Sequence, residues 1–132
     1  MSPSIERRLL QITIVLACLV PLLAGGSGVL HGPRVAHLAA PPVDLDSHFR
    51  YLSGLLLGLG LSFLTTVPTI ERHGPRFRLL GAIVIIGGFG RLLSLLLVGL
   101  PSPGQLFGLA MELGVVPVLM LWQARVAQLC PM

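Results

Sequence analysis

Four blocks of apolar residues, separated by short polar or proline-containing segments, constrain the fold of this chain more than any other feature. An α-helix needs about 20 predominantly apolar residues to cross a hydrocarbon layer roughly 30 Å thick, and each block reaches that length. The blocks predict membrane spans at about 9–30, 49–70, 79–100 and 103–124. We therefore expect an all-α fold, a four-transmembrane-helix bundle with antiparallel up-down topology, in one integral membrane domain over residues 1–132.

The composition argues against an ordinary soluble domain. Of the 132 residues, 54% are hydrophobic and 11% are charged, whereas soluble domains carry about 25% charged residues. The formal net charge is +4, and every lysine-or-arginine position is arginine. Because these arginines are sparse and lie at the ends of apolar blocks, we interpret them as topology signals and expect no nucleic-acid partner.

The first block has two interpretations. Glu6, Arg7 and Arg8 precede it, and small residues at 24–26 follow its apolar centre, as in a cleavable signal peptide. The block is long for a signal peptide, however, and three further spans follow it, which favours a retained helix. Pro21 is expected to kink that helix, because proline removes one backbone hydrogen bond.

The second span is expected to begin after a polar loop over residues 31–47, with Asp44 or Asp46 as its N-cap. Gly54 and Gly58 form a pair of small residues four positions apart. This spacing predicts that a neighbouring helix approaches closely along their face. Such a pair indicates helix packing rather than a ligand site.

A tight hairpin is predicted between the third and fourth spans, at Pro101–Gly104. Ser102 and Gln105 have the spacing of a capping box, and Pro103 fits the first helical position. Pro117 is expected to kink the fourth span.

The distribution of arginines predicts how the chain is oriented. Arg34 and Arg50 fall on the side away from the N-terminus. Six others fall on the side of the N-terminus: Arg7, Arg8, Arg72, Arg76, Arg78 and Arg125. The positive-inside rule therefore predicts a multi-pass protein of the inner (plasma) membrane with both termini cytoplasmic. The three arginines before the third span are also expected to contact anionic lipids.

Arg91 and Glu112 lie at matching depths in the third and fourth predicted spans. Each stands about ten residues from the centre of the hairpin, or about 15 Å along a helix. A charge at the centre of a membrane helix costs roughly 2.5–3.5 kcal/mol on insertion scales. We therefore expect the guanidinium and the carboxylate to pair across an antiparallel helix pair, with Gly88 and Gly108 allowing close backbones.

This charge pair has two compatible interpretations. It can be an ion pair that fixes helix register, or it can line a pocket in which Arg91 binds a negatively charged or carbonyl-bearing ligand. Asp46, His48 and Arg50 stand at the outer end of the second span and are expected to roof that pocket, with Asp46 and Arg50 spaced to bridge on a helix. The alternative for these three is a capped, solvated helix end.

The sequence contains no recognised signature of catalysis or metal binding. It has no GxSxG, HExxH or CxxC motif and no phosphate-binding glycine loop. Cys18 lies within the first span and Cys130 in the tail, so no internal disulfide is expected. We expect no catalytic residue, no metal and no cofactor, and an enzyme with His48 as its base is the least favoured interpretation.

Several motifs resemble one protein family across nearly the whole chain. They are Asp46-Ser47-His48-Phe49-Arg50, Gly88-Phe89-Gly90-Arg91-Leu92-Leu93-Ser94, Gly99-Leu100-Pro101-Ser102-Pro103, Glu112 and Trp122. In their order and spacing the chain resembles the domain of unknown function 4345 family of bacterial four-helix membrane proteins, with a more distant likeness to the DoxX-like architecture. The resemblance implies a four-span fold and polar residues at His48, Arg50, Arg91 and Glu112, and it supplies no established substrate.

Three functional hypotheses remain open at this point. The favoured one is a binding or accessory protein of the lipid bilayer that holds a lipid or quinone-like small molecule near Arg91 and Glu112. The second is a small proton-coupled transporter, present as a homo-oligomer, in which Glu112 titrates. The third is a structural subunit of a larger membrane complex.

Overall fold

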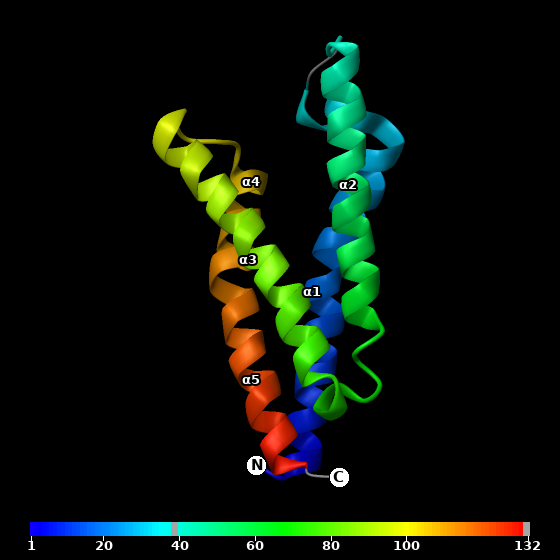
Figure 1. Cartoon of the computed structure of the whole chain (residues 1–132), viewed down its shortest axis with the longest axis vertical. Coiled ribbons are helices and arrows are strands. Elements are labelled where there is room, and N and C mark those ends of the chain that lie inside the picture. The colour runs from blue at the N-terminus through cyan, green and yellow to red at the C-terminus, as the bar shows by residue number, and fades with distance from the viewer. Residues whose placement is uncertain (38–39, 131–132) are drawn as a thin grey trace. The chain divides into compact units, whose positions relative to one another are not determined.

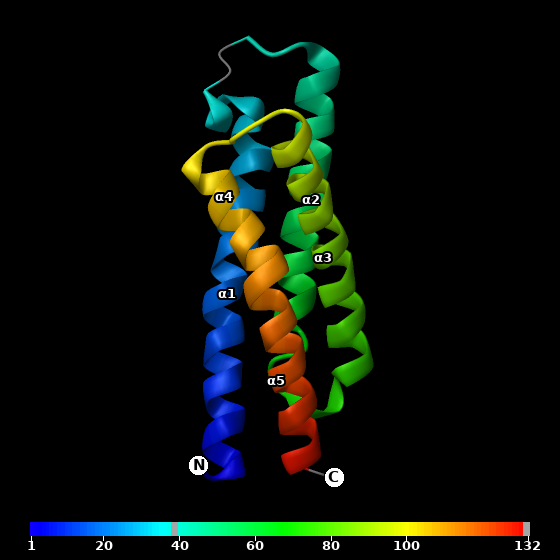
Figure 2. The same cartoon turned by 90° about the vertical axis from the view of Figure 1, so that its left-hand side faces the viewer.

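The computed structural model describes residues 1–37 and 40–130, and this part of the chain is helical without any strand (Figure 1). The predicted all-α fold is therefore confirmed. In chain order the elements are α1 (Pro3–His31), the 3₁₀ turn η1 (Gly32–Ala36), α2 (Val43–Leu64), the 3₁₀ turn η2 (Ile70–Arg72), α3 (Gly74–Leu97), α4 (Pro103–Ala110), the π-helical turn η3 (Met111–Val115) and α5 (Val116–Leu129). Figure 2 shows α4 continuing through η3 into α5, so Pro103–Leu129 forms one continuous helix.

Three of these helices are long and apolar enough to cross a membrane: Pro3–Ala36, Gly74–Leu97 and Pro103–Leu129. The chain therefore has the character of a membrane protein. Helix α2 falls outside this set although it has 22 residues. Its first two turns carry two acids, a histidine and an arginine, so its continuous apolar part is short.

The helix in this part of the chain is shifted from the span expected at about 49–70. Helix α2 runs over Val43–Leu64, which is six residues earlier than 49–70. The acids Asp44 and Asp46 lie inside its first turn, where a carboxylate interacts favourably with the helix dipole. Helix α2 ends at Leu64, and Pro68 cannot extend it because proline has no N–H to donate to the carbonyl of Leu64.

Helix α3 also begins earlier than predicted. It starts at Gly74 rather than at residue 79, with Pro75 in its first turn. Proline is tolerated there because the backbone N–H groups of the first turn have no helical acceptor. As a result Arg76 and Arg78 lie on the helix and not in a turn before it.

The chain divides into two compact units. The first comprises Met1–Leu10 and Thr69–Met132, and the second comprises Gln11–Pro68.

The second unit is an antiparallel pair formed by α1, from Gln11 onward, and α2. Gly25 lies so close to α2 that a Cβ atom there would stand 2.6 Å from the backbone nitrogen of Leu57, and one on Gly28 would overlap the Ser53 side chain. Within this unit α1 makes no close approach along Gly54 and Gly58, because added Cβ atoms there would meet at most one methyl group or nothing within 4 Å. The close contacts described in this helix pair are made by Gly25 and Gly28 of α1.

Proline does not interrupt α1, which continues as one helix through Pro21. In the second unit the ring of Pro21 packs against α2 at Gly60, where an added Cβ would lie 3.2 Å from the ring Cγ. Near the other end of the pair, the Gln11 amide Nε2 donates to the carbonyl oxygen of Val67 at 2.7 Å. Residues earlier in α1 thus contact residues later in or beyond α2, as expected for two antiparallel helices.

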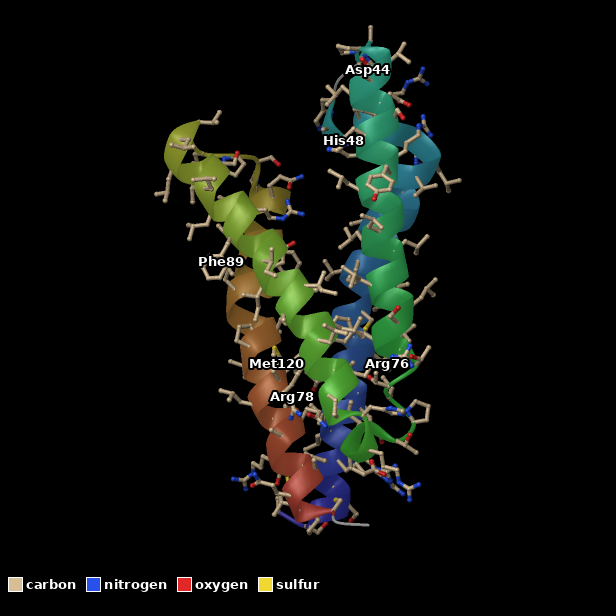
Figure 3. The ribbon with its side chains drawn as sticks, in the orientation of Figure 1. Asp44, His48, Arg76, Arg78, Phe89 and Met120 are labelled. Carbon is tan, nitrogen blue, oxygen red and sulfur yellow. The ribbon has the colours of Figure 1, made fainter. Side chains whose placement is uncertain are left out.

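The first unit contains a second antiparallel hairpin, in which α3 packs against α4, η3 and α5. A Cβ atom on Gly81 would overlap the side chain of Met120 (Figure 3), and one on Gly88 would lie 2.9 Å from the Cβ of Glu112. Both contacts fit one antiparallel register, in which residues later on α3 pack against residues earlier on the helix that follows the hairpin. That register carries Arg91 to the level of Gly108.

The helix after the hairpin is not uniformly α-helical. Residues Met111–Val115 form a π-helical turn that ends two residues before Pro117. Pro117 has no N–H to donate to the carbonyl of Leu113, and its ring would collide with that carbonyl in an ideal α-helix. The wider turn relieves this conflict, so the irregularity expected at Pro117 takes the form of a π-helical turn that contains Glu112.

Candidate functional site

The predicted pairing of Arg91 with Glu112 is confirmed. Arg91 Nε donates to Glu112 Oε1 at 2.9 Å, and the same nitrogen lies 2.9 Å from Oε2. The Arg91 side chain is 35% exposed and that of Glu112 is 14% exposed. The two charges therefore form a partly buried ion pair between α3 and η3.

Glycines on both helices make room for this pair. Gly88, one turn before Arg91, faces the Cβ of Glu112 and the side chain of Leu113. Gly108, one turn before Glu112, faces the guanidinium, whose Cζ atom would lie 3.6 Å from an added Cβ. The sequence expectation about these two glycines agrees with the geometry.

A third polar side chain completes the cluster. Arg91 Nη1 donates to the Oε1 atom of Gln105. The predicted capping box was therefore wrong: Ser102 does occupy the N-cap of α4, but it makes no side-chain capping bond, and Gln105 turns to Arg91 instead. A charged donor attracts the amide oxygen more strongly than the neutral backbone N–H at the N-cap does.

The cluster retains unused hydrogen-bonding groups. Among the described residues, the Nη2 group of Arg91 has no acceptor. The Oε2 atom of Glu112 is buried and receives no hydrogen bond, although it lies close to Arg91 Nε. An arginine has five N–H donors in a planar fork, so this guanidinium is bonded through Nε and Nη1 and keeps Nη2 as an unbonded donor.

The location of Glu112 in a π-helical turn also bears on function. Single π-helical turns within α-helices are rare and occur frequently at functional sites. Here the turn accompanies Pro117 and sets Glu112 against Gly88 and Arg91.

The second predicted cluster lies in the other unit. Asp46 and Arg50 form the expected i,i+4 bridge, with Arg50 Nε 2.8 Å from Asp46 Oδ2. Arg50 Nη1 also donates to the carbonyl oxygens of Val29 at 2.6 Å and Leu30 at 3.1 Å. Arg50 thereby satisfies carbonyls in the last turn of α1, where a positive charge interacts favourably with the helix dipole.

The hydrogen bond and the positive charge of Arg50 lower the pKa of Asp46 below its usual value. Next to this bridge stands Gly32, with a positive φ of 61°, and a Cβ there would lie 2.9 Å from Arg50 Nη2. Only glycine fits both that backbone conformation and that space. The predicted N-cap role of Asp44 or Asp46 was wrong, because Pro42 is the N-cap and no side chain caps α2.

His48 is not part of the bridge. It is exposed near the start of α2 (Figure 3), and its ring centroid lies 6.4 Å from that of Tyr51. Arg91 and Glu112 belong to one unit, whereas Asp46, His48 and Arg50 belong to the other. A shared pocket with these three as its roof stays a prediction.

Sequence reasoning missed a pair of ion bridges that hold the start of α1 within the first unit. Arg7 Nε lies 2.7 Å from Glu71 Oε2, and Arg125 Nε lies 2.7 Å from Glu6 Oε1, whose side chain is 6% exposed. Arg7 and Arg125 were interpreted only as topology signals. The sequence did hold a sign of both bridges. Each of the two acids stands next to an arginine at the end of a predicted span, where its charge can be neutralised outside the membrane.

Gln123 was also missed. It is fully buried, and its Nε2 donates to the carbonyl oxygen of Ile70 at 2.9 Å, while its Oε1 receives no hydrogen bond. This bond holds η2 against α5 in the first unit. A glutamine near the end of an apolar helix does not reveal its partner through spacing alone.

The described part of the chain gathers no group of three or more histidine, cysteine, aspartate or glutamate side chains that could hold a metal ion. Cys18 and Cys130 are free thiols, as expected from their positions.

Comparison with known proteins gives a family and nothing finer. No curated protein and no solved structure matches the chain. The model of one family, described as a domain of unknown function (DUF4345), matches residues 9–123, and the protein therefore belongs to this family.

Proposed function

We propose that this protein is a membrane-embedded binding or accessory protein whose ligand is bound by Arg91. The observation that carries the proposal is the open Nη2 group of a guanidinium that Glu112 and Gln105 already hold in place. The Arg91 side chain is 35% exposed, so an oxygen atom of a ligand can approach the guanidinium. A pre-oriented donor loses little conformational freedom when it binds, which favours affinity.

The charge balance favours a neutral oxygen acceptor. Arg91 and Glu112 together carry no net charge, and the pair lies between helices of membrane-spanning character. A full anion would leave one uncompensated negative charge in a medium where such charges are costly. A carbonyl group, as in a lipid ester or a quinone-like ring, accepts the same hydrogen bond without that cost.

The proposal includes a membrane arrangement. The protein would reside in the inner membrane, with α2 as a fourth membrane span and both termini in the cytoplasm. The exposed arginines Arg8, Arg72, Arg76 and Arg78 support this orientation, because the bridges from Arg7 to Glu71 and from Arg125 to Glu6 bring the start of α1, η2 and the last turns of α5 to the same end of the first unit. Cysteine scanning with a membrane-impermeant reagent tests it, and labelling of a cysteine near either terminus from the periplasmic side would contradict it.

Binding is tested by titrating the purified full-length protein with a short-chain benzoquinone and, separately, with a short-chain phosphatidylcholine. The Arg91→Gln variant should weaken binding of the preferred probe about tenfold or more, because a hydrogen bond to a charged group contributes about 1.5–3 kcal/mol. Gln105→Leu should weaken it less, because the guanidinium keeps Glu112 as a partner.

Arg34→Gln is the matched control, since Arg34 is an exposed arginine of the other unit without an acid bridge among the described residues. Its binding should equal that of the wild type. Equal binding by the Arg91→Gln protein and the wild type would contradict the proposal.

A further inference from the structure

The first unit carries a positive charge that its own acids do not neutralise. Its three acids are all bridged, Glu6 by Arg125, Glu71 by Arg7 and Glu112 by Arg91. The remaining arginines of the unit have no acid partner within the described chain: Arg8, Arg72, Arg76 and Arg78. We call these four residues the arginine cluster.

The members of the arginine cluster lie at one end of the unit. Three of them fall within the seven-residue stretch 72–78, and the bond between Arg7 and Glu71 brings Arg8 to the same end. All four side chains are exposed. Figure 3 shows Arg76 and Arg78 near the start of α3, and since residues two positions apart on a helix point roughly 200° apart, their side chains leave opposite sides of that start.

The local backbone adds to this positive potential. Helix α3 begins inside the cluster without an acidic residue in its first turn and without a side-chain cap. The N-terminal end of a helix carries the positive pole of the helix dipole. The chain therefore places arginines at the positive end of a helix dipole, where an acid would ordinarily be favourable. An anion from outside the chain relieves the repulsion between these positive charges.

The cluster also stands at the edge of the apolar surface. Exposed Leu79, Ile83 and Ile86 follow it directly along α3. Arg78 turns back from this surface toward the start of the helix, because its Nη1 lies 3.5 Å from the position of a Cβ on Gly74. Arginines at the ends of membrane helices extend in this way toward the headgroup layer.

From these observations we propose that the arginine cluster binds the phosphate groups of anionic phospholipids and selects them from the surrounding bilayer. Guanidinium groups bind phosphate oxygens in a bidentate manner. An acidic protein or a nucleic acid would match the charge but not the apolar surface that continues from it. A phospholipid matches both, with its phosphate on the arginines and its acyl chains along α3.

Trp122 provides the reporter for a direct test, since it is the single tryptophan and adjoins Gln123, whose amide lies beside Gly74 at the start of α3. The full-length protein is reconstituted in vesicles of equal parts phosphatidylcholine and phosphatidylglycerol. In one preparation the phosphatidylcholine carries brominated acyl chains, and in the other the phosphatidylglycerol does. The ratio of Trp122 quenching in the two preparations measures local enrichment at constant membrane composition.

We expect brominated phosphatidylglycerol to quench the wild type more strongly. Arg76→Gln should lower the enrichment by up to about fivefold, which corresponds to about 1 kcal/mol for an arginine near an anionic surface. The triple variant Arg72→Gln, Arg76→Gln, Arg78→Gln should bring the quenching ratio close to one. Raising the salt concentration should reduce the wild-type enrichment, because surface charges are screened.

The matched control is Arg34→Gln, which removes an exposed arginine from the other unit. It should keep the wild-type quenching ratio. Circular dichroism of every variant checks that the helices are intact. Equal quenching of the wild type by the two brominated lipids would overturn the proposal, and so would a triple variant that keeps the full preference.

Discussion

A Cβ atom on Gly88 would lie 2.9 Å from the Cβ of Glu112, closer than two such atoms approach in proteins. The backbones of α3 and η3 therefore meet at a distance that only glycine permits. Arg91 follows one turn later on α3, and this close contact allows its guanidinium to reach Glu112 with a 2.9 Å hydrogen bond.

Replacing Gly88 with alanine should destabilise the first unit by about 1–3 kcal/mol, the usual cost of overpacking a filled interface. The added methyl would meet Leu113 and Glu112, both of which belong to the facing helix. Gly87→Ala is the matched control, because an added Cβ there meets nothing within 4 Å. Thermal unfolding in detergent compares the two variants, and equal melting temperatures would show that the helices are not in contact at Gly88.

Replacing Gln123 with leucine should lower the free energy of unfolding by about 1–3 kcal/mol, because the buried carbonyl of Ile70 loses its donor. The loss should fall toward the lower end of that range, since the variant also removes the unpartnered Oε1 atom. The control is Gln128→Leu, an exposed glutamine on the same helix. If both variants unfold alike, the bond to Ile70 does not hold η2 in place.

The bridge between Asp46 and Arg50 should make the second unit sensitive to acid. Arg50 lowers the pKa of Asp46 in the folded state, so the bridge stabilises the fold at pH values above the unfolded pKa of about 3.9. That contribution is lost as the pH falls below about 4 and through the lowered folded-state pKa. The stability difference between the wild type and Asp46→Asn should therefore be constant above that pH and shrink below it.

Asp44→Asn is the comparison for this measurement. Asp44 lies in the same first turn of α2, is exposed and has no bridge among the described residues. Its substitution should change the acid dependence less than Asp46→Asn does. Melting temperatures of the three proteins between pH 3 and 7 decide the matter, and a pH-independent difference for Asp46→Asn would contradict the assignment.

The sequence predicted the class of fold and the pairing of Arg91 with Glu112. Both predictions rest on the cost of placing polar or charged groups in an apolar environment. A buried charge in an apolar helix is so costly that its partner can be inferred from depth alone, and the hairpin predicted at Pro101–Gly104 set the depth of both residues. The bridge between Asp46 and Arg50 was equally local, because i,i+4 spacing on a helix determines it.

Other features depend on which residues contact each other across neighbouring helices, and sequence spacing alone does not predict those contacts. The chain has 16 glycines, and the packing role fell to Gly25 and Gly28 rather than to the regularly spaced Gly54 and Gly58. Gln105 had the spacing of a capping residue, but the nearby guanidinium attracted it more strongly. The bounds of α2 differed because hydropathy marks the apolar part of a helix and not the polar turns at its start.

The most direct test of the pairing is a charge exchange, measured by unfolding of the full-length protein in detergent. Arg91→Glu and Glu112→Arg should each lower the free energy of unfolding by about 1–3 kcal/mol, less than for a fully buried pair because Arg91 is partly exposed. The protein with both changes should recover part of that loss, because the charges again face each other and the Gln105 amide can turn to donate to the new carboxylate. A double variant as unstable as the sum of the two single variants would contradict a contact between these side chains.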